Sequence, residues 1–436
     1  MKTESVLRAG TSSIDITPPI GTLMAGYSAR SQFSTGVHDP LMARVLVAGS
    51  GDSALVIASC DLIAIWRGLA EKLRRCAEGL GVPPSNVMVA AYHNHSGPVP
   101  DMGLEGLEKW SDDVTERLCG CVRSALGRLA PCRLYLSRAE VHGATVNRRR
   151  PLDGPVDEEL TCLSWVGASP VCHLVNFSCH AVTLGPDNTL ISSDFPGYLN
   201  RAVEAETGGM CAYLNGACGD INPLTESLRA RLESGEDVYD RTGGTFDEAR
   251  LLGQRLANAV LLSLPGLEVE DAPIAGRTIV EEVPVKLGLP RSQLKDQYSL
   301  QKEDVHRLES SNAPAQQLYL SVLRLFALER LLRFSREGCA RVEIQGIRIG
   351  RVVLLGFPGE LFVETGIRIK NLARQMELEP VIVEIANDYL GYLPTEKAFG
   401  EGGYEVENAR SLGFGPDLER RIIEGARRLL ASLCDL

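Results

Sequence analysis

Two histidines stand one residue apart in the stretch "AAYHNHSGPVP", residues 90–100. Imidazole is the commonest metal ligand and the usual general acid or base, so His93 and His95 can do chemistry. On an extended chain, residues two apart face the same side, which predicts that both rings point into one cavity. A metal would then be bound by one ring or by both. Alternatively, both are structural histidines that hydrogen-bond the turn at Ser96-Gly97-Pro98.

Other strand-like runs also end in polar residues. These endings are His180 in "CHLVNFSCH", Glu360 in "VVLLGFPGE", Tyr392 in "PVIVEIANDYLGY", and Asp220 with Asn222 in "CAYLNGACGDINP". Ligand sites of α/β proteins form where strands end at their carboxyl ends. Two histidines, a glutamate and a phenol make a mixed nitrogen and oxygen set that suits zinc and leaves a position for water.

The elements that must position these residues alternate along the chain. Strands are predicted at 43–49, 54–60, 86–91, 133–141, 171–177, 210–216, 340–350, 352–357 and 380–387. Helices are predicted at 66–80, 106–130, 196–207, 246–263, 363–377 and 416–433. This alternation predicts an α/β fold with a mixed central β-sheet, or several sheets, flanked by helices.

Three further features concern the organisation of the chain. Residues 291–337 carry apolar residues at helical spacing and predict a helical insertion, either a hairpin packed on the main domain or a lid. The polar, glycine-rich stretch 224–247 predicts an exposed loop. No internal repeat or linker is visible in the sequence.

Composition restricts the class of protein. The 436 residues are 44% hydrophobic, which allows a large core, and the formal net charge of −11 argues against a broad basic surface for nucleic acid. No apolar run is long enough to cross a membrane, and the start "MKTESVLRAG" lacks the apolar core of a secretion signal. The twelve cysteines, many within apolar runs, are typical of buried thiols in a reducing compartment. We therefore expect a cytoplasmic protein.

Ordered motifs along almost the whole chain resemble the neutral/alkaline ceramidase family. They are "AGTSSIDITPPIGTLMAGY", "GVHDPLMARVLV", "YHNHSGP", "VNRRR", "NFSCHAVTL", "LISSDFPGYL", "NGACGDINP", "GFPGELF" and "ANDYLGYLPTEKAFGEGGYE". The resemblance implies one catalytic domain over residues 1–436, with zinc held by His93, His180, Glu360 and Tyr392. It further implies that His95 and Tyr404 line the substrate site and that Arg148 binds the polar head of the substrate.

The sequence departs from that family in two places. Asn222 stands where ceramidases carry a serine, and the chain ends soon after Tyr404, without room for the immunoglobulin-like C-terminal domain of true ceramidases. We therefore expect a zinc-dependent hydrolase that cleaves an amide (N-acyl) or related acyl bond of a small molecule, and not membrane ceramide. Asp194, Asp220 and Asn222 either orient ligands or water, or act as turn and cap residues.

Two alternatives remain at this point. The first is a non-catalytic family member that keeps zinc for structure or ligand binding. The second is a cysteine hydrolase that uses Cys179 or Cys218 with a histidine. Nothing in the sequence specifies a protein partner, and a homo-oligomer is compatible with it.

Overall fold

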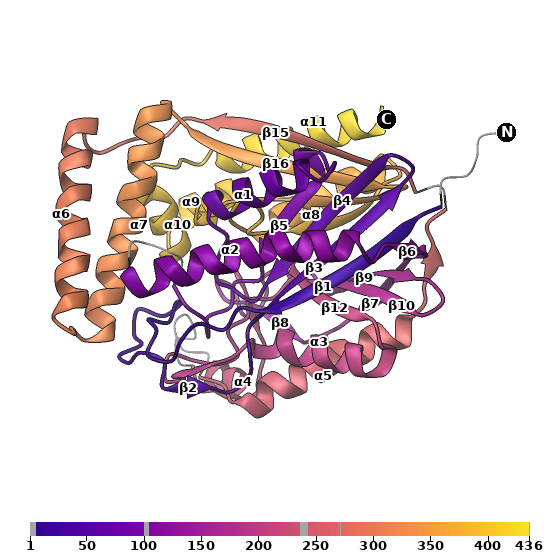
Figure 1. Ribbon diagram of the computed structural model, residues 1–436. Coiled ribbons are helices and arrows are strands. Elements are labelled where there is room, and N and C mark those ends of the chain that lie inside the picture. The colour runs from indigo at the N-terminus through magenta and orange to yellow at the C-terminus, as the bar shows by residue number, and fades with distance from the viewer. Residues whose placement is uncertain (1–5, 100–103, 236–242, 271, 436) are drawn as a thin grey trace.

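The same arrangement of four long strands occurs three times in the computed structural model (Figure 1). The structure describes all residues except 1–5, 100–103, 236–242, 271 and 436. The first sheet consists of β1 (Arg8–Asp15), β3 (Met42–Ser50), β4 (Ser53–Cys60), β5 (Val87–Ala91) and the short β6 (Ala130–Pro131). The second consists of β7 (Arg133–Glu140), β9 (Glu159–Val166), β10 (Pro170–Phe177), β12 (Met210–Asn215) and the short β14 (Leu267–Glu268). The third consists of β15 (Ile274–Val283), β16 (Ala340–Ile349), β17 (Val352–Gly356) and β19 (Glu379–Val383).

Each of these sheets is mixed in the same way. The first three long strands pair antiparallel, and the fourth pairs parallel to the third, as β4 with β5, β10 with β12 and β17 with β19. A parallel pair needs a crossover connection. The crossover helices are α1 (Arg67–Glu78), α3 (Asp194–Thr207) and α8 (Val363–Gln375). A second helix follows each fourth strand, namely α2 (Glu105–Leu126), α5 (Phe246–Ser263) and α11 (Leu418–Cys434).

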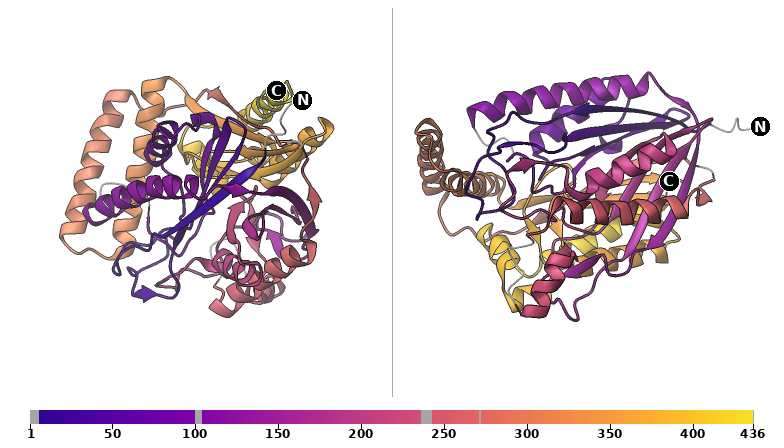
Figure 2. Two further views of the ribbon diagram at one scale, coloured as in Figure 1. Left: turned by 45° about the vertical axis from the view of Figure 1, so that its right-hand side comes forward. Right: turned by 90° about the horizontal axis from the view of Figure 1, so that it is seen from below.

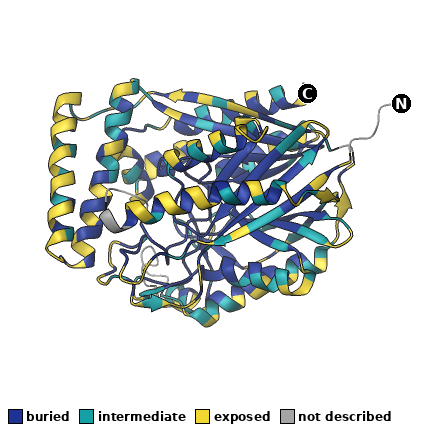
Figure 3. Ribbon diagram, in the orientation of Figure 1, coloured by how far each residue is buried: buried dark blue, intermediate teal, exposed yellow. Residues whose placement is uncertain are grey.

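The three sheets surround a shared inner core and carry their helices on the outside (Figure 2). Along β3, Leu46 and Ala48 face that inner core, whereas Val45 and Val47 face the layer that contains α1 and α2. Strands buried on both faces read as continuous apolar runs, which is why the sequence predicted most of them. In Figure 3 the central strands are accordingly mostly buried.

The insertion forms a hairpin of α6 (Arg291–Ser310) and α7 (Ala315–Glu337), as the helical spacing predicted. Leu318, Tyr319, Val322 and Leu325 of α7 join the outer core of the first sheet. Figure 3 shows that α6 is largely exposed. The hairpin therefore packs on the main body through α7, which is one of the two arrangements that the sequence allowed.

The carboxyl ends of the parallel strands meet at one place. The amide of Ala91, at the end of β5, donates to the carbonyl of Ile385 at 3.3 Å. The amide of Glu384, directly after β19, donates to the carbonyl of Asn215 at the end of β12 at 3.1 Å. These bonds join the three sheets where His93, His180 and Glu360 follow their strands.

Smaller elements complete the described structure. They are β2 (Gly36–Val37), η1 (Pro84–Asn86), β8 (Thr145–Asn147), β11 (Leu190–Ile191), β13 (Ile221–Pro223), α4 (Glu226–Ser234), β18 (Glu360–Leu361), β20 (Tyr392–Leu393), α9 (Glu396–Glu401) and α10 (Tyr404–Ser411). Within the described ranges, no helix has both the length and the apolar character needed to cross a membrane.

Two sequence predictions about elements were wrong. The stretch 224–247 is not a continuous loop, because α4 occupies Glu226–Ser234, where Thr225 accepts the amide of Leu228 as an N-cap, and 236–242 lie outside the described residues. The strand predicted at 380–387 ends at Val383, because the next residues turn away to bond the ends of the other two sheets.

Candidate metal centre and active site

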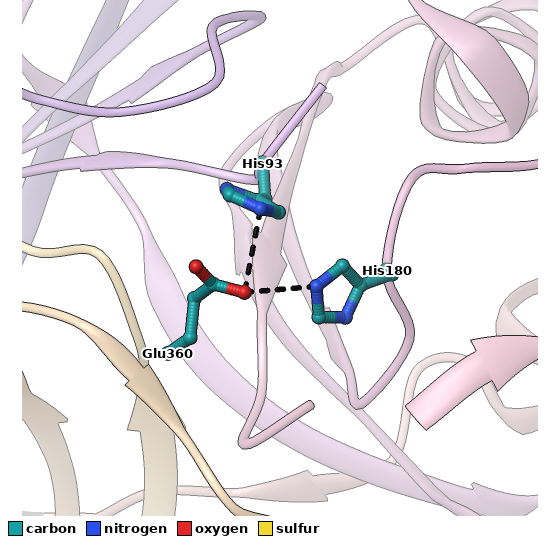
Figure 4. A group of neighbouring side chains, drawn as sticks. All are labelled: His93, His180 and Glu360. Carbon is teal, nitrogen blue, oxygen red and sulfur yellow. Dashed lines mark hydrogen bonds and ion pairs between the residues drawn. The ribbon is translucent and has the colours of Figure 1, made fainter. Parts of the chain in front are cut away.

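Three buried side chains from the three sheets meet at one point (Figure 4). Glu360 Oε2 lies 3.0 Å from His180 Nε2 and 3.4 Å from His93 Nε2. These separations are close to the about 3.3 Å expected between neighbouring ligands of a tetrahedral zinc ion with bonds of about 2.0–2.1 Å. The strand ends that the sequence singled out are thus brought together, and their three ligand atoms lie within 4.8 Å of one another.

The other nitrogen of each ring fixes which atom faces the centre. Nδ1 of His93 donates to the carbonyl of Ile63 at 2.9 Å, and Nδ1 of His180 donates to the carbonyl of Cys218 at 2.6 Å. A neutral imidazole with its proton on Nδ1 carries a lone pair on Nε2. Both lone pairs then face the Glu360 carboxylate, which is itself an acceptor. A cation among the three atoms resolves this conflict, so the donor set fits a metal ion.

The electrostatics favour the same ionisation states. Burial, together with the charge of Arg148, lowers the pKa of His180 to about 4, so its imidazole is neutral at neutral pH. Burial acts to raise the pKa of Glu360, but positive charge on His93 and His180 and the hydrogen bond from Tyr389 outweigh it and lower that pKa to about 2. With both rings neutral, a bound cation would supply this charge. Neutral imidazole and ionised carboxylate are the forms that bind metal.

Tyr389 is a site residue that sequence reasoning missed. Its hydroxyl donates to the second oxygen of Glu360, Oε1, at 2.5 Å. The signal was present, because Tyr389 is the first tyrosine of the motif whose second tyrosine is Tyr392. A donor on Oε1 orients the carboxylate so that Oε2 faces the two histidines.

The two histidines of the opening motif do not share an extended strand. β5 ends at Ala91, and His93 has a left-handed φ of 62°, so the strand-geometry argument was wrong. Their rings still lie side by side, with centroids 4.8 Å apart, because the chain turns at His93. His93 belongs to the three-residue group with His180 and Glu360, whereas His95 does not.

His95 is buried with both ring nitrogens unused. It is 8% exposed, and within the described part of the chain neither Nδ1 nor Nε2 has a hydrogen-bond partner. Burial and the neighbouring His93 and His180 hold the pKa of His95 well below its usual value. Gly26, with a φ of 98°, provides the space, because a Cβ there would lie 2.3 Å from the His95 ring. A buried polar ring without a partner is typical of a side chain that awaits a ligand.

Tyr392 lies beside Glu360 in a two-stranded sheet. β18 and β20 pair in parallel, with Glu360 opposite Tyr392. The Tyr392 hydroxyl accepts a hydrogen bond from Nη2 of Arg148 at 3.0 Å. The ring of Tyr404, which is 56% exposed, lies edge-on to that of Tyr392 at 5.7 Å. The structure thus places both predicted tyrosines next to the three-residue group.

Arg148 is held by protein groups on every side. Besides Tyr392, its guanidinium donates to Glu405 at 2.9 Å, to the carbonyl of Gly219 at 2.9 Å and to Asn222 at 3.3 Å. Arg148 is not among the described residues that line the neighbouring cavity. Its contact with a substrate head group stays a prediction, and the visible contacts are those of a residue that positions Tyr392.

A cavity of about 190 Å³ adjoins the group. Its wall contains the predicted site residues His93, His95, Glu360, Tyr392 and Tyr404. It also contains Tyr389 and side chains of α7 that no sequence motif indicated. The cavity therefore adjoins the group that could hold a metal ion.

The remaining candidates are engaged elsewhere. The Asp220 carboxylate accepts from the amide of Val363 and from Asn147, which is a structural role. Cys179 and Cys218 are fully buried, and burial raises the pKa of both thiols well above the usual value. Neither thiol lines the cavity within the described residues. These properties argue against a cysteine nucleophile.

The comparisons with known proteins agree with this architecture. The family model described as neutral/alkaline non-lysosomal ceramidase, N-terminal, matches residues 7–225. The chain is 25% identical to the neutral ceramidase of Pseudomonas aeruginosa, over 91% of this chain and 68% of that protein. It is 24% identical to the neutral ceramidase of Mycobacterium tuberculosis, over 88% of this chain and 70% of that protein.

The fold is also similar to a solved structure. The crystal structure of the Pseudomonas aeruginosa neutral ceramidase superposes with a TM-score of 0.75 and 21% sequence identity, covering 99% of this chain and 75% of that one. Together with the family match, this makes the chain a member of the neutral/alkaline non-lysosomal ceramidase family.

Proposed function

We propose that this protein is a zinc-dependent hydrolase that cleaves an amide (N-acyl) or related acyl bond of a small molecule other than membrane ceramide. The observation that carries the proposal is the convergence of three acceptor atoms, Nε2 of His93, Nε2 of His180 and Oε2 of Glu360, beside a cavity. His93, His180, Glu360 and Tyr392 would hold the metal. A bound zinc ion supplies Lewis-acid activation of water and of the scissile carbonyl.

The chain's own residues supply positioning and proton transfer. The neutral ring of His95 faces the cavity with free nitrogens, so it can take up a proton and pass it to the leaving nitrogen. The phenol of Tyr404, at the cavity wall, can donate to the developing oxyanion, and one such donor is typically worth about 3 kcal/mol. Arg148 holds the Tyr392 hydroxyl through its Nη2.

We further propose that residues 1–436 form one catalytic domain and that the protein works in a reducing compartment such as the cytoplasm. The inner core shared by the three sheets supports the first proposal. The second is supported by the cysteines, which are free and mostly buried.

A panel of N-acyl amides and matched esters tests the proposed reaction. The zinc-loaded protein should hydrolyse at least one of them, chelation should abolish the activity, and added zinc should restore it. Thiol alkylation should leave the rate unchanged. Hydrolysis that survives both chelation and His93→Ala contradicts the proposal.

A second candidate function is a non-catalytic, zinc-containing ligand-binding protein. Asn222 favours it, because its Oδ1 accepts from Arg148 at a position where ceramidases carry a serine. This candidate predicts bound zinc and a bound ligand without turnover of any amide or ester in the panel.

A further inference from the structure

Two helices contribute to the wall of the cavity beside the candidate metal centre. α7 contributes Tyr319, Val322, Leu323, Phe326 and Ala327, whose spacing places them on one helical face. α10 contributes a second set at the same kind of spacing, namely Tyr404, Asn408 and Ser411. The α7 side is therefore mostly hydrocarbon, whereas the α10 side carries hydroxyl and amide groups.

The α7 wall is fixed to the metal centre at two points. The Tyr319 hydroxyl accepts the amide of Gly26 at 2.9 Å, beside His95. Three turns further on, Nε of the buried Arg330 donates to the carbonyl of Tyr389 at 2.7 Å, and the hydroxyl of Tyr389 donates to Glu360. Because both contacts are made to residues of the site, α7 is part of the site wall and not a separate lid.

Phe326 lies between these two fixed points in the sequence of α7 and packs against Tyr389, the residue that donates to Glu360. Its ring faces that of Tyr389 with centroids 5.8 Å apart. Leu323 of α7 and Tyr404 of α10 line the cavity and are 41% and 56% exposed, and we infer that the cavity opens to solvent beside these two residues.

The size of the cavity limits what it can enclose. Its volume of about 190 Å³ lies below the about 300–1,000 Å³ of pockets for drug-sized ligands. A cavity of this size encloses only a short chain, and we set the limit at about six carbon atoms, the value that the series below tests. A longer chain must leave through the opening into water.

We propose that α7 makes this site selective for substrates with one short acyl chain, up to about hexanoyl, lying against Val322, Phe326 and Ala327. This inference rests on the proposed amide hydrolysis for its substrate class. Each methylene buried in the cavity should raise kcat/KM about fourfold, and methylenes beyond the opening should add nothing.

The test is a chain-length series on the zinc-loaded protein. Amides of one chromogenic amine with acetyl, butanoyl, hexanoyl, octanoyl and dodecanoyl groups are compared by kcat/KM. The value should rise to about hexanoyl and then stay level. A rise that continues at the same slope to dodecanoyl overturns the proposal.

Variants of α7 should change the chain length at which kcat/KM stops rising, which we call the break in the series. Phe326→Ala enlarges the cavity and should shift the break to longer chains, whereas Ala327→Leu fills it and should shift the break to shorter ones. Leu320→Ala is the matched control, because Leu320 is exposed on α7 and outside the cavity lining. A break that neither cavity variant moves also overturns the proposal.

A binding measurement separates this inference from the proposed function. If no amide is hydrolysed, the proposed function fails, but the free carboxylic acids of the same lengths still test the cavity. The rise in the melting temperature of the zinc-loaded protein that each acid causes should grow with chain length to about hexanoate and then stay level. Shifts that keep growing to dodecanoate overturn the selectivity proposal.

Discussion

Replacing the buried Arg148 by methionine should lower the free energy of unfolding more than replacing an arginine of an exposed ion pair does. Arg148 is 8% exposed and Glu405 is fully buried, and they pair at 2.9 Å. In Arg148→Met the buried Glu405 carboxylate keeps its ion pair with Arg149 at 2.8 Å. Removing one partner of a buried ion pair typically lowers the free energy of unfolding by about 3–5 kcal/mol. Because Arg149 stays paired with Glu405, we expect a value at the lower end, about 3 kcal/mol.

Urea unfolding of the metal-free protein, followed by tryptophan fluorescence, measures this loss. Arg150→Met is the matched control, because Arg150 pairs with Glu364 at 3.1 Å while 31% exposed, and such pairs are worth about 0–1 kcal/mol. Glu405→Gln added to Arg148→Met should recover part of the loss, because it removes the buried carboxylate charge that Arg148 no longer offsets.

The same variant also separates two roles for Arg148. If Arg148 positions Tyr392, Arg148→Met should lower kcat for every acyl substrate, whatever its head group. If it binds the head group, KM should rise only for substrates with a polar head. Destabilisation no larger than that of Arg150→Met would refute the reasoning from burial.

Three further predictions concern the site. His93→Ala should lose zinc, whereas His95→Ala should keep zinc and lose turnover, measured by metal analysis and activity; equal zinc loss in both means that the pair binds the metal jointly. Gly26→Ala should lower turnover with zinc retained, because its Cβ would meet the His95 ring at 2.3 Å, and unchanged turnover contradicts that placement of His95. Tyr389→Phe should weaken zinc affinity about 10–100-fold in a competition titration, since Glu360 loses its orienting donor; unaltered affinity argues against that role.

Much of the fold was visible in the sequence because the strands are buried on both faces. Short continuous runs rich in β-branched residues, such as "ARVLVAG", are typical of strands that are buried on both faces. The long strands β1, β9 and β15 were missed. In β1 and β15 exposed polar residues such as Glu282 interrupt the apolar pattern. β9 is largely buried, but Thr161 and Ser164 interrupt its apolar run. The threefold repetition of strand order was also missed, since it is a property of pairing and leaves no repeated residues.

The three residues that could hold a metal were predictable from the sequence, and the α7 side of the cavity was not. His180 and Glu360 each follow an apolar run, so their place at a strand end could be inferred from local sequence. Tyr319 and Phe326 lie in a helix with apolar residues around much of its circumference, and only tertiary packing shows which face meets the site. The full engagement of Arg148 was likewise invisible, because its partners are distant in sequence.

The central claim is that His93, His180 and Glu360 hold a zinc ion. Anomalous difference maps from crystals of the protein as purified, recorded on both sides of the zinc absorption edge, test it most directly. The account predicts one peak within bonding distance of Nε2 of His93, Nε2 of His180 and Oε2 of Glu360, present only above the edge. Crystals grown with zinc that show no peak at these atoms contradict it.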